Sequence, residues 1–201
     1  MRLDRTVSVR TALEQLNEVG LDDLTPRRIA ADLDVRAPAP HWHVKNEREP
    51  LDDMAATIFA DALSGLETPR RGGSWVEWTA GTARGLSTTM PAYRDGARVP
   101  SGTHLSNAVL GRPVELALRT PCDAGFTVRD AARGITSVHS CAQGFTVEVQ
   151  AEQTDRSTPD ADDRFPLTAR ARAELDTDPE ERFEHGLRLM LSGLRPSRFA
   201  G

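Results

Sequence analysis

Apolar residues recur every three or four positions near the N-terminus, which is the spacing of one face of an α-helix. The run consists of Val9, Ala12, Leu13, Leu16 and Val19. Gly20 comes directly after it, and glycine commonly stands just past the last residue of a helix. The pattern therefore predicts a first helix that ends before Gly20.

Two shorter helices are expected next. Thr25 and Pro26 supply an N-cap and a proline at the first helical position, so a helix is predicted over 27–33. Asp34 marks a turn, because aspartate tolerates the left-handed backbone conformation better than most residues. A third short helix is predicted over 37–43.

The rest of the chain predicts further helices. Asn46 can cap a fourth helix that reaches Leu66, and the proline and glycines of 67–73 separate this helix from the next one. The segments 91–102 and 151–166 are expected to be loops, and the second is acidic and expected to be mobile. Later helices are predicted at 75–90, 105–119, 128–148 and 179–194, with a kink or break at 111–113. Since no convincing strand alternation is found, the expected fold is all-α.

Composition indicates the class of protein. The 201 residues are 38% hydrophobic and 27% charged, which suits one folded domain or two small ones. The sequence has no run of about 18 apolar residues and no secretory signal, and its two cysteines give no disulfide framework. We therefore expect a cytoplasmic protein without a membrane partner, divided at the 67–73 boundary into residues 1–66 and 67–201.

Charge alone points away from DNA. The chain has 30 acidic and 25 basic residues, whereas nucleic-acid-binding domains are usually basic. However, two short helices joined by a tight turn after a longer packing helix are typical of a helix-turn-helix, whose second helix enters the major groove. An ordinary helical hairpin has the same spacing, so the spacing leaves DNA binding open.

Longer residue runs carry more information than the spacing. They include Leu16-Asn17-Glu18-Val19-Gly20, Trp42-His43-Val44-Lys45-Asn46, Arg94-Asp95-Gly96-Ala97-Arg98-Val99 and Phe183-Glu184-His185-Gly186-Leu187. With these runs the chain resembles the tetracycline-repressor (TetR) family of bacterial regulators over nearly its whole length. The resemblance implies a homodimer with a three-helix helix-turn-helix domain over 1–66 and a helical domain for ligand binding and dimerisation over 67–201.

The same resemblance implies a dimer interface made of a four-helix bundle, from the helices at 128–148 and 179–194 of each protomer. The second of these helices has an apolar face that suits the role. The face consists of Phe183, Leu187, Met190, Leu191 and Leu194. The alternative is that the same face is core within one chain.

Candidate DNA contacts come from the resemblance and from side-chain chemistry. Arg27 matches a base-reading arginine and can bond bidentately to guanine, while Thr25 and Lys45 can donate to phosphates. Ala37 and Ala39 replace polar contacts, which leaves apolar contact with thymine methyl groups. The complete set is Thr25, Arg27, Arg28, Ala37, Pro38, Ala39, His41, His43 and Lys45.

Some positions depart from the family pattern. Glu47 would repel a phosphate, and Pro40 and Pro50 lie in expected helices, where an interior proline costs about 3 kcal/mol. Residues 1–50 hold eight Lys and Arg against nine Asp and Glu, so this segment is not basic. We expect few phosphate contacts, weak non-specific binding and a shallow salt dependence.

The residues that would bind the family's ligand also differ from the family pattern. A histidine that binds the magnesium ion of the drug chelate falls on Pro100, and Glu148 alone cannot satisfy a hard cation, which needs several oxygen ligands. No metal, cofactor or Mg–tetracycline site is expected. A mostly apolar cavity for a small inducer is expected instead. Its candidates are Leu63, Thr82, Leu86, Thr103, His104, Leu118, His139 and Glu148, any of which could be ordinary core.

The predicted function is a repressor that binds a palindromic operator as a dimer and is released by a small, largely apolar inducer. The alternative is an all-α small-molecule-binding protein or enzyme without operator binding. Catalysis is not expected, because the sequence shows no Ser/His/Asp or Cys/His constellation, phosphate loop or paired-carboxylate motif.

Overall fold

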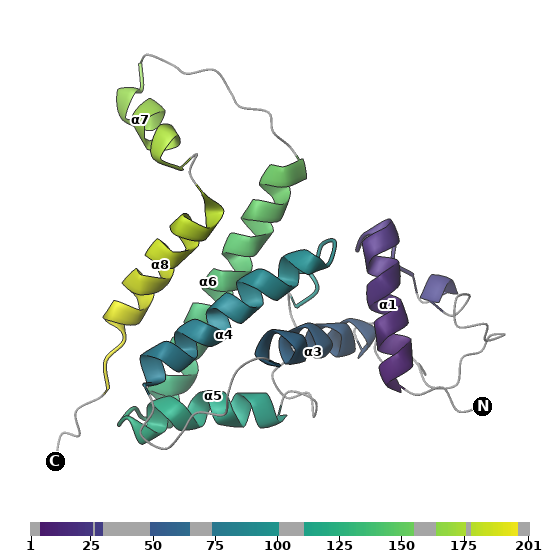
Figure 1. The fold of residues 1–201 in the computed structure, drawn as a ribbon, viewed down its shortest axis with the longest axis horizontal. Coiled ribbons are helices and arrows are strands. Elements are labelled where there is room, and N and C mark those ends of the chain that lie inside the picture. The colour runs from purple at the N-terminus through teal and green to yellow at the C-terminus, as the bar shows by residue number, and fades with distance from the viewer. Residues whose placement is uncertain are drawn as a thin grey trace.

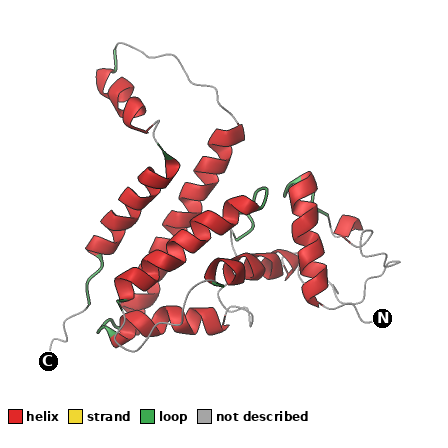
Figure 2. Ribbon diagram, viewed as in Figure 1, coloured by secondary structure: helices red, strands yellow, loops and turns green. Residues whose placement is uncertain are grey.

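The computed structural model describes residues 5–25, 27–29, 49–64, 74–100, 111–154, 164–175 and 178–196. Every regular element in these ranges is helical (Figure 2), as the all-α prediction required. The elements are α1 (Arg5–Val19), α3 (Glu49–Leu63), α4 (Trp75–Thr89), the 3₁₀ helix η1 (Met90–Ala92), α5 (Gly111–Asp123), α6 (Val128–Thr154), α7 (Pro166–Leu175) and α8 (Pro179–Gly193). The helix predicted over 37–43 lies outside the described residues.

The N-terminal unit is built as its apolar pattern predicts. α1 packs on α3, and Ile29 of the short second helix lies in the same core. α1 ends at Val19, and the next residue, Gly20, has φ +81°, a conformation that glycine adopts at little cost. The buried residues of this core include Val9, Ala12, Leu13, Leu16, Met54, Ala55 and Ile58.

Pro50 is harmless in this fold. α3 begins at Glu49, so Pro50 lies in the first helical turn. The N–H groups of that turn have no partner within the helix, and the group that proline lacks is not missed. Pro50 therefore lies early in its helix, where the sequence pattern placed it, and the interior penalty of proline does not apply to it.

Three long helices form the second half of the molecule. α4, α6 and α8 pack against one another around a separate core (Figure 1). Arg84 of α4 forms a two-bond ion pair with Glu184 of α8, and Arg182 of α8 does the same with Glu152 of α6. α5 packs against α6, and α7 lies beyond the ends of α6 and α8.

Some predicted boundaries were wrong. The kink or break predicted at 111–113 stays a prediction, because α5 begins at Gly111 and residues 101–110 lie outside the described part of the chain. α6 continues to Thr154, beyond the predicted end. α7 was not predicted, although its Ala, Arg, Leu and Glu residues are good helix formers. In the described part of the chain, no helix is both long and apolar enough to span a membrane.

Candidate ligand cavity and DNA-binding surface

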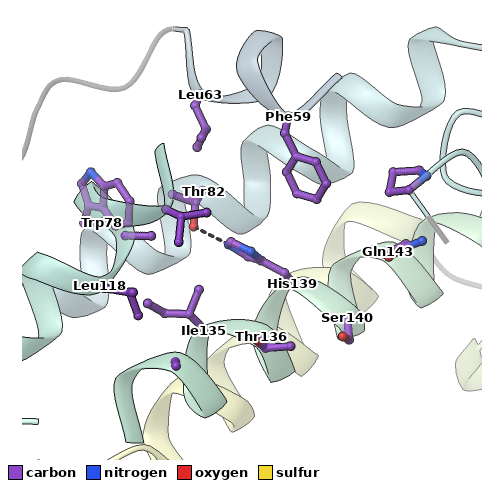
Figure 3. A pocket seen from close by; sticks show the side chains of 14 residues that line it. Phe59, Leu63, Trp78, Thr82, Leu118, Ile135, Thr136, His139, Ser140 and Gln143 are labelled. Atoms are coloured by element: carbon purple, nitrogen blue, oxygen red, sulfur yellow. Dashed lines mark hydrogen bonds between the residues drawn. The ribbon is translucent and has the colours of Figure 1, made fainter. Parts of the chain in front are cut away.

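A cavity of about 210 Å³ lies between α3, α4, α5 and α6. Figure 3 shows Phe59 and Leu63 on one side of it, and Thr136 and Ser140 on the other. Its described walls are mostly apolar and carry no charged side chain. The lining residues are Phe59, Leu63, Trp78, Thr82, Pro100, Val114, Ala117, Leu118, Ala132, Ile135, Thr136, His139, Ser140 and Gln143.

The main polar feature of the cavity is a pair of side chains from α4 and α6. Oγ1 of Thr82 lies 3.2 Å from Nε2 of His139 (Figure 3) and also donates to the carbonyl oxygen of Thr79 at 2.8 Å. The ring of Phe59 lies 6.3 Å from the His139 ring, centroid to centroid. Burial lowers the pKa of His139 to about 4, because an apolar environment disfavours the charged imidazolium. The ring is therefore neutral at ordinary pH.

Four of the predicted ligand residues line this cavity, namely Leu63, Thr82, Leu118 and His139. Leu86 does not. It is buried in the core under α1 and α3, because it lies on the face of α4 that meets the N-terminal unit. Glu148 is exposed on α6 and does not line the described cavity, while Thr103 and His104 lie outside the described residues.

Most of the α6 residues that line the cavity were not among the predicted ligand residues. Ala132, Ile135, Thr136, Ser140 and Gln143 all line the cavity with His139. Most of them lie three, four or seven positions from His139, so helical spacing from this residue could have found them. Trp78 lies four positions before Thr82 on α4, so helical spacing from Thr82 could have found it as well.

The cavity shares a helix with the N-terminal unit. Phe59 and Leu63, near the end of α3, line the cavity, whereas Met54 and Ile58 of the same helix are buried against α1. α3 also lies very close to α4 at this point, because a Cβ added at Gly85 would collide with the carbonyl oxygen of Ala62. α3 thus connects the wall of the cavity to the core beneath α1.

A loop after η1 makes a second connection. Gln143, a cavity residue, donates to the carbonyl oxygen of Ala97 at 2.9 Å. Asp95 lies two residues earlier in this loop and accepts a hydrogen bond from the backbone N–H of Leu21 at 2.9 Å, just past the end of α1. Asp95 holds a left-handed backbone with φ 57°, which aspartate tolerates better than most residues. The loop thus contacts both the cavity wall and the N-terminal unit.

An ion pair and a hydrogen bond join the loop after η1 to the N-terminal unit. Arg98 pairs with Asp22 at 2.8 Å, and this arginine lowers the pKa of the Asp22 carboxyl. Arg10 of α1 forms two bonds with Asp61 of α3, and the hydroxyl of Tyr93 donates to the same carboxylate at 3.1 Å. These hydrogen bonds, led by that of Arg10, lower the pKa of Asp61.

The described part of the predicted DNA surface is Thr25, Arg27 and Arg28, and all three are exposed. Oγ1 of Thr25 accepts from the backbone N–H of Arg28 at 3.3 Å, which is the predicted N-cap. The other predicted contacts lie outside the described residues. They are Ala37, Pro38, Ala39, His41, His43 and Lys45.

The apolar face of α8 is not a free surface. Phe183, Leu187 and Leu191 are buried within the chain itself, against α4 and α6. Met190 and Leu194 are partly buried against the same core. Periodicity identified an apolar face, and the chain's own helices bury Phe183, Leu187 and Leu191 of it. The place of this face in a dimer interface stays a prediction.

Comparison with known proteins agrees with this architecture. The family described as "Tetracyclin repressor-like, C-terminal domain" matches residues 68–197. The tetracycline repressor protein class A from transposon 1721 of Escherichia coli is 34% identical over 202 residues, covering 98% of this chain and 93% of that protein.

Solved structures give the same result. A possible TetR family transcriptional regulator from Streptomyces coelicolor A3(2) is 36% identical, with a TM-score of 0.81, and the match covers 97% of this chain and 100% of that one. A class A tetracycline repressor in complex with 5a,6-anhydrotetracycline and magnesium is 30% identical, with a TM-score of 0.69 and coverage of 98% and 100%. These matches confirm the resemblance seen in the residue runs: the chain belongs to the TetR family of transcription regulators.

Proposed function

We propose that this protein is a dimeric transcriptional repressor. Residues 1–66 bind a palindromic operator, and a small, largely apolar inducer enters the cavity in residues 67–201 and releases the DNA. The observation that carries the proposal is that α3 belongs both to the cavity wall and to the core beneath α1. A ligand in the cavity therefore contacts the same rigid helix on which the DNA-binding unit is packed.

Release requires a difference in affinity between two states. An inducer shifts the equilibrium only by as much as it prefers the state that does not fit the operator. Ligand contacts with Phe59 and Leu63 press on α3, and contacts with Gln143 change its bond to Ala97. Both effects alter the spacing of the two DNA-binding units, which must match half-sites about one helical turn apart.

The inducer differs from the ligand of the class A repressor, which was solved with 5a,6-anhydrotetracycline and magnesium. In the described part of this chain, no three His, Cys, Asp or Glu side chains are placed to hold a metal ion, and Pro100 lies in the cavity wall. We therefore expect tetracycline with Mg²⁺ to leave operator binding unchanged. Tight, Mg²⁺-dependent binding of the drug in calorimetry would contradict this.

The outward face of α8 is a further candidate for the dimer interface. On α8, Gly186, Leu189 and Gly193 share one outward face by helical spacing, and Leu189 has 61% of its surface exposed. A Cβ added at Gly144 on α6 or at either of these glycines would meet nothing within 4 Å. Because α6 and α8 lie side by side, these faces let a second copy approach closely and complete a four-helix bundle.

Fluorescence anisotropy with DNA that flanks the gene tests operator binding. We expect specific binding over random DNA, lost in Arg27→Ala because a bidentate guanine contact is worth about 1–3 kcal/mol. Arg133→Ala, at an exposed arginine of α6, is the matched control and should bind as wild type does. Equal affinity for both DNAs would refute the repressor and favour a small-molecule-binding protein.

Light scattering at micromolar concentration tests the dimer. We expect a dimer in the wild type and a monomer in Leu189→Glu, since a buried unpaired carboxylate is costly. Val128→Glu is the control, because Val128 is also exposed, with 67% of its surface free, but lies at the start of α6. A wild-type monomer would overturn the assignment.

A further inference from the structure

The hydrogen bonds around Thr82 determine which nitrogen of His139 carries its proton. A threonine hydroxyl has one proton, and Thr82 donates it to the carbonyl oxygen of Thr79 at 2.8 Å, since a carbonyl can only accept. The contact at 3.2 Å between Thr82 Oγ1 and His139 Nε2 must then use a lone pair of the oxygen. Nε2 is consequently the donor in this contact.

The other ring nitrogen is left with an open lone pair. A neutral imidazole has one ring proton, so a protonated Nε2 leaves Nδ1 as an acceptor. Among the described residues, the only side-chain hydrogen bond of His139 is the one to Thr82. The ring lies in the wall of the cavity, next to Phe59 and between Thr82 and Ile135 (Figure 3).

The walls around this acceptor favour an uncharged ligand. The described lining residues carry no charge, and most are apolar. A charged ligand would lose its hydration without gaining an ion pair there. An engineered cavity of about 150 Å³ binds benzene, so a cavity of about 210 Å³ suits a molecule of about two fused rings.

We propose that the cavity takes a neutral, mostly apolar molecule that carries a hydroxyl group, and that this hydroxyl donates a hydrogen bond to Nδ1 of His139. The assignment rests on the proposed function and gives its inducer a chemical class, that of phenols and related aromatic alcohols. An ether or ketone of the same shape is disfavoured, because it would place its own lone pair against that of Nδ1. A carboxylate is disfavoured for the same reason and by its charge.

Three probes that share one naphthalene ring test the proposal by calorimetry, namely 2-naphthol, 2-methoxynaphthalene and 2-naphthoate. We expect the wild type to bind 2-naphthol about tenfold more tightly than 2-methoxynaphthalene, the worth of one hydrogen bond, and to bind 2-naphthoate least. His139→Leu should remove the preference for 2-naphthol. Thr79→Val, one turn from Thr82 and outside the cavity lining, should keep it. Equal binding of the first two probes, tightest binding of 2-naphthoate, or binding of none would overturn the proposal.

A second measurement needs no variant. Long-range ¹H–¹⁵N correlation spectra of the ¹⁵N-labelled protein report which ring nitrogen is protonated. We expect Nε2 to be protonated and Nδ1 to be bare, and the Nδ1 resonance to shift when 2-naphthol is added but not when 2-methoxynaphthalene is added. A proton on Nδ1 in the free protein would overturn the proposal.

The two proposals fail separately. Anisotropy with the operator fragment, measured without probe, reports on DNA binding alone. If 2-naphthol binds as described but the DNA is bound no better than random DNA, the ligand class stands and the repressor is refuted. If the DNA binds specifically but no probe binds, the reverse holds.

Discussion

His139 should make the stability of this protein depend on pH between about 4 and 6.5. Burial lowers the pKa of His139 from 6.5 to about 4. Between these values the unfolded chain binds a proton at this residue and the folded chain does not. The free energy of unfolding is therefore at its full value above pH 6.5 and falls as the pH falls towards 4.

The magnitude comes from the two pKa values. Each pH unit between them is worth about 1.4 kcal/mol, so the full loss below pH 4 is about 3 kcal/mol. At pH 5 the unfolded imidazole is almost fully protonated and the folded one almost fully neutral, and the loss relative to pH 7 is about 2 kcal/mol. Carboxylates with a lowered pKa, such as Asp61, lose their contribution mainly at lower pH.

Urea unfolding of the wild type and of His139→Leu at pH 7, 6 and 5 tests this prediction. The variant should lose about 2 kcal/mol less than the wild type between pH 7 and 5, whatever its stability at pH 7. His185→Asn, at an exposed histidine of α8, is the control and should keep the wild-type dependence. The same pH dependence in the wild type and in His139→Leu would refute the reasoning, because the ring would not then be held neutral by burial.

Packing and charge give three further predictions. Gly85→Ala should lower the free energy of unfolding by about 1–3 kcal/mol or more, because the added Cβ collides with the backbone of Ala62. Gly111→Ala is the control and should cost little, because a Cβ there meets nothing within 4 Å. Equal effects of the two substitutions in thermal melts would contradict the close crossing of α3 and α4. Thr79→Val should raise the free energy of unfolding by about 1 kcal/mol, because the buried Oγ1 of Thr79 has no hydrogen-bond partner among the described residues. A lower free energy of unfolding in urea titrations would show that this hydroxyl does have a partner. A plot of the logarithm of operator affinity against the logarithm of salt concentration should have a slope no steeper than about −7 for the dimer, because residues 1–50 offer few cations for contacts with phosphates. A steeper slope in anisotropy titrations would reveal further phosphate contacts.

Much of the fold could be predicted from the local pattern of apolar and capping residues. The apolar spacing up to Gly20 predicts α1, and the hydroxyl of Thr25 caps the next helix as expected. These features depend on neighbours three or four positions away, which the sequence displays directly. The residue runs around Trp42 and Arg94 indicated the family before any geometry was known.

The ends of the helices were harder to predict from the sequence. The sequence shows that a proline is present, but its effect depends on its position within the turn. Pro50 and Pro113 fall in the first turns of α3 and α5, where they cost little. The start of each helix, and hence the effect of its proline, depends on how the segment packs.

The sequence by itself determined which faces of the helices are apolar and which family the chain resembles. Only the tertiary structure decided what covers each face, because periodicity does not name the neighbour. Phe183 and Leu187 therefore proved to be core within one chain. Thr82 and His139 are 57 positions apart, and their hydrogen bond exists only because α4 and α6 pack side by side. A cavity and its open acceptor depend on distances between helices, and packing sets these distances.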